Sequence, residues 1–161
     1  MTSGVPVGLL QLDDWWYNAN DTAHMCVSDG VGNKTLFPDG ITGLYKALHA
    51  VDPGVALDVY ANHFEPSYPL LFDHPEIETI PSLLYDYPGR LPAASSSLRF
   101  YTLLFESWKV AGIRSYEIDF MKDFVYNQTA WYLDPEGARF WLEGSEVTSN
   151  QAVVCVASRL F

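Results

Sequence analysis

The sequence is poor in basic residues and has no long apolar run. Nine Lys and Arg stand against twenty Asp and Glu, which gives a formal net charge of −11 at pH 7. Nucleic-acid binding relies on clustered Lys and Arg that neutralise phosphates, so this balance argues against a nucleic acid as partner. No apolar run approaches the roughly 20 residues that cross a bilayer, so no membrane-spanning segment is predicted.

Cysteine is limited to Cys26 and Cys155, which lie far apart in the sequence. A disulfide between them and two free thiols are both compatible with the sequence, because spacing alone does not bring them together. The spacing of a metal site is missing, and so is the glycine-rich turn that binds dinucleotides. The sequence therefore predicts neither a metal nor a cofactor.

Signals of cellular location point in two directions. The first residues lack the basic and apolar regions of a secretory signal, so no signal peptide is predicted. Three Asn-x-Thr sequons nevertheless occur, at Asn20, Asn33 and Asn127. Such sequons favour passage through a secretory compartment, and the location stays open between the two.

Aromatic residues are abundant. They make up 15% of the chain, with five Trp and ten Tyr among them. Flat rings of this kind can stack on sugar rings, and they can equally build a large aromatic core. For any single ring we expect the core.

Apolar runs alternate with helical patterns along the chain. Strands are expected over residues 7–12, 55–61, 113–120 and 152–157, and helices over 41–51, 98–111 and 135–142. Alternation of this kind predicts a parallel sheet with right-handed crossovers, either doubly wound or part of a β/α barrel. The stretch 65–94 is rich in Pro, Tyr and Asp and lacks periodicity, so we expect a long functional loop there.

Helix boundaries are marked by capping residues. Asp39 and Asp134 are expected to cap the first and third helices, and Ser95–Ser97 the second. Gly112 stands where a helix-ending glycine would, and Gly144 is expected to weaken or end the third helix.

Polar residues follow three of the expected strands, where ligands bind in both candidate architectures. Asp13 and Asp14 follow the first strand, Asn62 and His63 the second, and Asp119 ends the third. Glu117 lies two residues before Asp119, so both side chains should point to the same side. The alternative for each carboxylate is a turn-capping role.

These motifs, in this order, resemble the α-galactosidase-type glycoside hydrolases of families 27 and 36. The matching residues are Asp13, Asp14 and Trp16 in an Asp-Asp-x-Trp strand end, Phe37-Pro38-Asp39-Gly40 before a helix, and the strand from Gly112 to Asp119. The resemblance implies a TIM-type (β/α)8 barrel and retaining hydrolysis of O-glycosidic bonds. It implies that Asp119 is the nucleophile and that Asp13, Asp14 and Trp16 hold the sugar. From their places at strand ends, Glu117 and His63 are further candidate sugar contacts, and a structural role is the alternative for a lone histidine such as His63.

The sequence departs from the family in two respects. Glu117 replaces a Lys that contacts sugar hydroxyls, and a carboxylate beside Asp119 should raise one of the two pKa values. The family's acid/base would lie beyond Phe161, and a full barrel takes about 250 residues. Residues 1–161 are therefore expected to supply about half of a barrel, in roughly four β/α units, as one partial domain of a longer enzyme.

Three functions remain open on these grounds. The first is the retaining α-glycosidase. The second is a non-catalytic carbohydrate-binding relative, which both departures favour. The third is a different hydrolase or lyase on the same barrel, in which a metal would be held by Asp13, His63 and Asp119, although no spacing supports it. A carbohydrate is the expected partner of the first two, and the sequence leaves the oligomeric state open.

Overall fold

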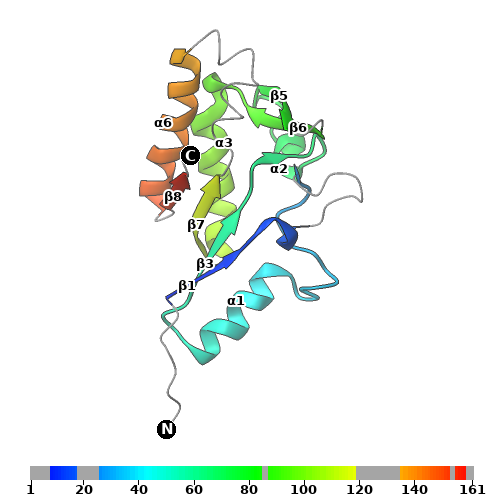
Figure 1. Ribbon diagram of the computed structural model, residues 1–161, viewed down its shortest axis with the longest axis vertical. Helices are drawn as coiled ribbons and strands as arrows, with labels where there is room; N and C mark the ends of the chain where they lie inside the picture. The colour runs from blue at the N-terminus through cyan, green and yellow to red at the C-terminus, as the bar shows by residue number, and fades with distance from the viewer. Residues whose placement is uncertain (1–7, 18–25, 85–86, 119–134, 153–154, 159–161) are drawn as a thin grey trace.

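A computed structural model describes residues 8–17, 26–84, 87–118, 135–152 and 155–158, and it is an α/β structure with two sheets (Figure 1). None of the helices in these ranges combines the length and the apolar character needed to span a bilayer.

The first sheet is entirely parallel and its strands follow one another in chain order. It contains β1 (Leu9–Leu12), β3 (Ala56–Tyr60), β7 (Ile113–Ile118) and β8 (Cys155–Ser158), in the order β1-β3-β7-β8. The strands are connected through α1 (Gly40–Val51), α3 (Ala94–Val110) and α6 (Pro135–Ala152). A doubly wound sheet reverses its strand order at a switch point, and these four strands show no reversal. The strands and helices predicted from the sequence are confirmed with shifts of up to four residues at their ends, except that α6 extends ten residues beyond its predicted end at residue 142.

Right-handed crossovers that always step to the next strand place their helices on the same face of a sheet. Helices α3 and α6 accordingly pack side by side against one another (Figure 1). Helices α3 and α6 therefore do not cover the opposite face of the sheet.

The second sheet was not predicted. It contains β2 (Cys26–Val27), β4 (His63–Phe64), β5 (Thr79–Leu84) and β6 (Tyr87–Pro92), in the order β2-β4-β6-β5. Strands β5 and β6 form an antiparallel pair, and the short α2 (Pro69–Asp73) precedes them. The long loop expected over residues 65–94 is therefore mostly regular structure. Pro81 lies on β5 at the edge of this sheet, where a residue without an N–H is tolerated.

The serines at the start of α3 have a different role from the predicted one. The N-cap residue is Ala93, and Ser95–Ser97 lie inside the helix. Ser97 Oγ donates to the carbonyl oxygen of Trp141 on α6 at 2.7 Å, and Ser96 Oγ accepts from the Glu78 N–H at 2.9 Å. These hydroxyls tie α3 to its neighbours. At the other end Gly112 adopts φ +83°, the left-handed conformation expected of a helix-ending glycine.

Two further expectations about helix boundaries have different outcomes. Asp39 is the N-cap residue of α1, although its side chain makes no capping hydrogen bond. Helix α6 continues past Gly144 to Ala152, so Gly144 does not end it. An added Cβ at Gly144 would lie 2.5 Å from Ser97 Oγ and 2.8 Å from the backbone nitrogen of Leu98. Because Gly144 has no side chain, α6 can approach α3 closely at this point.

We expect Gly144→Ala to lower the free energy of unfolding by about 1–3 kcal/mol, because the methyl group must push the two helices apart. Urea denaturation followed by circular dichroism measures this. Gly8→Ala is the matched control, since a Cβ there meets nothing within 4 Å. A gain of about 1 kcal/mol at residue 144, which helix propensity alone would give, would contradict the packing role.

Candidate functional site

The two faces of the parallel sheet differ in chemistry, and Tyr116 on β7 shows which is which. Its ring packs against α3, with ring centroids 5.4 Å from Trp108 and 5.8 Å from Phe105. Its hydroxyl donates to the carbonyl oxygen of Ala61 at 2.7 Å. Since side chains alternate along a strand, Ser115 and Glu117 point to the opposite face.

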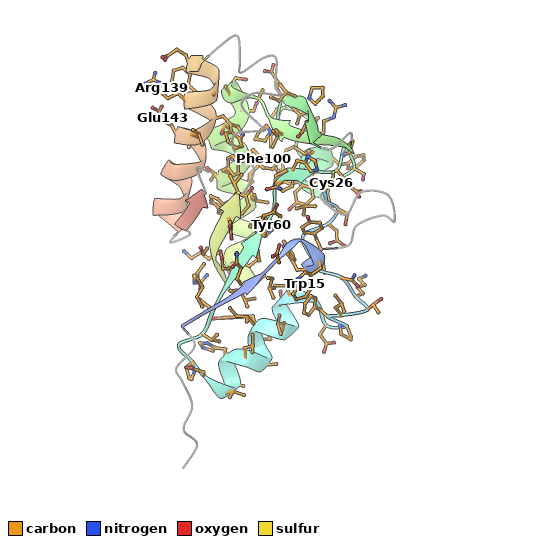
Figure 2. All side chains as sticks on the ribbon, in the orientation of Figure 1. Trp15, Cys26, Tyr60, Phe100, Arg139 and Glu143 are labelled. Carbon is orange, nitrogen blue, oxygen red and sulfur yellow. The ribbon has the colours of Figure 1, made fainter. Side chains whose placement is uncertain are left out.

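The opposite face is lined by polar side chains. In the sheet register Gln11 on β1 lies opposite Asp58 on β3, Asp58 opposite Ser115, and Tyr60 opposite Glu117. We call these five residues, Gln11, Asp58, Tyr60, Ser115 and Glu117, the polar face. The Gln11 side-chain amide donates to the Glu117 carboxylate, which joins β1 to β7 across the intervening strand. Tyr60 lies near the middle of the molecule (Figure 2).

The carboxylates of the polar face are buried. Asp58 and Glu117 are each 6% exposed. Burial raises the pKa of Asp58, while hydrogen bonds from the Ser115 hydroxyl and the Val59 N–H act in the opposite direction. Asp58 Oδ1 accepts no hydrogen bond from any described residue. A charge in such surroundings costs stability, and residues retained at that cost are typical of functional sites.

We expect Asp58→Asn to make the protein more stable at neutral pH. Because the folded-state pKa of Asp58 is raised, its ionisation favours the unfolded chain, and this penalty grows as pH rises from below the unfolded pKa through the folded one. The advantage of the variant should therefore be present at pH 7 and shrink toward pH 3.

Urea midpoints between pH 3 and pH 8 test this expectation. Asp73→Asn is the control, because it removes the same charge from an exposed position and should shift stability by less than about 0.5 kcal/mol. An equal loss of stability in Asp58→Asn at every pH would mean that the hydrogen bond to Ser115 outweighs the burial of charge.

The residues predicted at the end of β1 are placed differently from one another. Asp13 is exposed, and its carbonyl oxygen accepts the N–H of Trp16 at 3.1 Å. Asp14 begins the 3-10 helix η1 (Asp14–Trp16), and the prediction for its side chain stays a prediction. Trp16 is 0% exposed and its indole N–H donates to the carbonyl oxygen of Tyr60 at 2.8 Å. In this position Trp16 has no surface for a sugar.

The predicted pair at the end of β7 is described only in part. Glu117 lies on the polar face at the C-terminal end of the strand, where the sequence placed it. Asp119 lies outside the described residues, so its role as a nucleophile stays a prediction.

His63 is held within the second sheet. It is 0% exposed, and its Nδ1 lies 3.0 Å from Ser82 Oγ. Burial lowers the pKa of His63 to about 4, so the ring is neutral at pH 7. A Cβ added at Gly89 would lie 2.7 Å from the imidazole, which shows how tightly the ring is covered. The proposed contact with sugar therefore has no accessible surface here.

Cys26 lies beside His63 in the same sheet and is a free, buried thiol. Burial, together with the Glu65 carboxylate, raises the pKa of Cys26 to about 12. The thiolate is the nucleophilic form, so this cysteine is inert at neutral pH. Within the described ranges, no three His, Cys, Asp or Glu side chains are grouped as a metal site requires.

Sequence reasoning missed Gln11, Asp58 and Ser115. Gln11 stands two residues before Asp13 and Ser115 two residues before Glu117, while Asp58 stands four residues before Asn62, the polar residue expected after its own strand. Period-two alternation would have found them, because they share a face with those residues.

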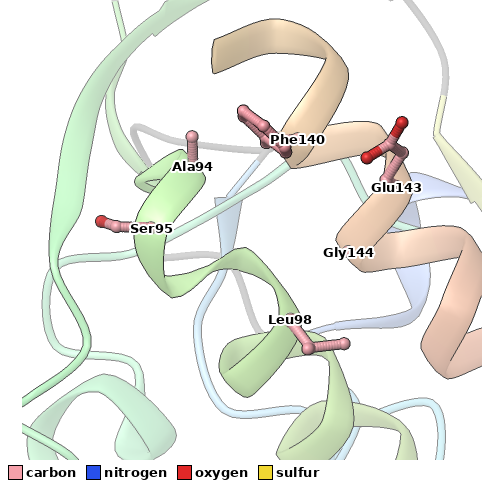
Figure 3. A pocket seen from close by; sticks show the side chains of 6 residues that line it. All are labelled: Ala94, Ser95, Leu98, Phe140, Glu143 and Gly144. Atoms are coloured by element: carbon pink, nitrogen blue, oxygen red, sulfur yellow. The ribbon is translucent and has the colours of Figure 1, made fainter. Parts of the chain in front are cut away.

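A separate pocket of about 530 Å³ opens between the first turns of α3 and the middle of α6 (Figure 3). Its lining is mainly apolar, and the Glu143 carboxylate beside it lies 3.5 Å from an Arg139 guanidinium nitrogen. This pocket lies in the helical layer, and the described residues that line it do not form convergent polar groups of the kind that orient a sugar. It is lined by Ala94, Ser95, Leu98, Phe140, Glu143 and Gly144.

Comparison with solved structures finds glycoside hydrolases. An α-galactosidase from Thermus thermophilus in complex with stachyose matches with a TM-score of 0.58 at 12% identity over 94% of this chain and 33% of that one. A putative α-N-acetylgalactosaminidase from Bacillus halodurans matches with a TM-score of 0.58 at 13% identity, over 92% of this chain and 39% of that one. A family 36 α-galactosidase from Geobacillus stearothermophilus matches with a TM-score of 0.54 at 17% identity, over 93% of this chain and 23% of that one.

At these identities the likeness shows the fold, and the chain spans about a quarter to two fifths of the lengths of these proteins. Neither a protein-family model nor a curated protein matches the sequence. The fold is thus that of a segment found in α-galactosidase-type glycoside hydrolases.

Proposed function

We propose that the chain forms part of a β/α barrel of a retaining α-glycosidase, with the polar face turned toward the interior of the barrel. The observation that carries this proposal is the row of polar side chains on one face of a sequentially ordered parallel sheet. The fold shared with α-galactosidases supports it. Parallel barrels carry their active sites at the C-terminal ends of such strands.

In this proposal Asp119 attacks the anomeric carbon as the glycosidic C–O bond breaks and the leaving oxygen takes a proton from a second carboxyl. Water then attacks the glycosyl-enzyme intermediate, returns a proton to that carboxyl and releases Asp119. Asp13 and Asp14, at the end of β1, accept hydrogen bonds from sugar hydroxyls. The Gln11 amide holds the Glu117 carboxylate, which accepts a hydrogen bond from a further sugar hydroxyl. Glu117 stands at the position where the α-galactosidase families have a lysine. The second carboxyl that a retaining enzyme needs belongs to the remaining strands of the barrel.

We expect Asp119→Asn to lower kcat for p-nitrophenyl α-D-galactopyranoside by about 10³-fold or more in the full-length protein, because an amide cannot form the intermediate. Asp52→Asn is the control, since Asp52 lies in the turn before β3, at the opposite end of the strands. Turnover that survives Asp119→Asn would remove Asp119 as the nucleophile.

A non-catalytic carbohydrate-binding protein is the second candidate, favoured by Glu117. A carboxylate beside Asp119 disfavours ionisation of the pair, which weakens a nucleophile at neutral pH. Titration calorimetry with methyl α-D-galactopyranoside separates the two. Binding without turnover by the full-length protein favours this candidate, and binding with turnover favours the enzyme.

A further inference from the structure

A second feature at the end of β1 lies outside the polar face and was not singled out from the sequence. Trp15 is the middle residue of η1 and is 50% exposed, whereas its neighbour Trp16 is fully buried. Figure 2 shows Trp15 just beyond the C-terminal end of β1. It therefore lies at the rim of the sheet where the sugar contacts are proposed.

The turn that carries Trp15 is fixed from both sides. Trp16 anchors it in two ways. Its indole N–H donates a hydrogen bond to the carbonyl oxygen of Tyr60, and its ring makes an edge-on contact with Trp108, with ring centroids 6.0 Å apart. The N–H of Asn33 donates to the carbonyl oxygen of Trp16 at 2.7 Å, which joins the turn to the segment before α1. A rigid backbone of this kind presents Trp15 at little entropic cost on binding.

The indole of Trp15 is also supported from behind. It stacks on Phe37, with ring centroids 6.1 Å apart and an angle of 25° between the planes. Phe37 packs against the hydrophobic core and leads into α1. One side of the indole is thus held by Phe37, and the half of the residue that is exposed is available to a ligand.

The surroundings of the ring match the chemistry of a sugar. A pyranose presents C–H groups on its face and hydroxyls at its edge, so it is bound by an aromatic face with a carboxylate close by. Asp13 stands two residues before Trp15 and is exposed. Trp15 follows the end of β1 and stacks on a residue of the segment before α1, so it lies outside the five residues of the polar face, at the rim of the sheet.

We propose that Trp15, supported by Phe37, is the stacking platform for a second sugar unit of an oligosaccharide whose terminal unit lies at the strand ends. The inference rests on the proposed function and adds to it the residue that recognises the second sugar unit. Trp15 is a specificity-determining residue in this arrangement and takes no part in the chemical step.

The test compares two probes by titration calorimetry in the Asp119→Asn background, which prevents turnover. The probes are stachyose, a tetrasaccharide, and methyl α-D-galactopyranoside, a single unit. Trp15→Ala should weaken stachyose binding about 10-fold, which corresponds to about 1.4 kcal/mol, and change methyl galactoside binding less than about 2-fold. Trp15→Phe should recover most of the loss, since it restores a ring.

Leu36→Ala is the matched control, because Leu36 adjoins Phe37, is 52% exposed and has no ring. It should leave both affinities unchanged. As a second measurement, stachyose should slow the oxidation of Trp15 by N-bromosuccinimide, followed by peptide mass spectrometry, with buried Trp16 and Trp108 as internal references.

Three results would overturn the inference in distinguishable ways. Unchanged stachyose binding in Trp15→Ala would show that the ring is no platform, while the proposed function would stand. An equal loss for both probes, or an equal loss in Leu36→Ala, would assign a structural or general apolar role to the patch. Failure of the parent protein to bind either probe would overturn the proposed function, and this inference with it.

Discussion

The packing of Tyr116 against α3 is the contact on which the arrangement of the sheet depends. Its fully buried ring meets Trp108 and Phe105, and its hydroxyl satisfies the carbonyl oxygen of Ala61, just past β3. A one-residue slip of β7 would turn Tyr116 to the polar face and Glu117 into the aromatic core. Both a large apolar loss and a buried charge oppose such a slip, so the register that places Glu117 is strongly determined.

The polar face does not follow the packing preference that Tyr116 illustrates, because it buries carboxylates in place of apolar side chains. Asp58 is buried on a strand whose neighbours Leu57 and Val59 are fully apolar, and its pKa is raised because burial disfavours the charge. An aliphatic residue would fit a purely structural sheet better. Glu117 is partly compensated by the Gln11 amide, which also fixes its carboxylate. The face therefore costs stability that packing does not return, and the proposed function supplies a reason for that cost.

The regular part of the fold could be predicted because its signals are local. Apolar runs gave the four parallel strands, and Gly112 marked the end of α3 through its left-handed backbone. The second sheet was missed because prolines such as Pro81 indicate a loop unless the strand is known to lie at an edge, which only tertiary structure decides. Gly144 was misjudged for a similar reason, since its meaning depends on how closely α3 approaches.

The adjacent residues Trp15 and Trp16 show why the site itself was harder to predict. The Asp-Asp-x-Trp motif selects Trp16, yet the 3-10 turn directs this residue into the core, where its indole N–H donates to the Tyr60 carbonyl oxygen. The same turn directs Trp15 outward, onto Phe37. A buried anchor and an exposed ring on consecutive residues are coupled, because the hydrogen bond that fixes one also fixes the direction of the other. In the proposed arrangement the motif residue Trp16 therefore acts by fixing its neighbour, and the residue that would meet the ligand, Trp15, is one that the motif leaves unspecified.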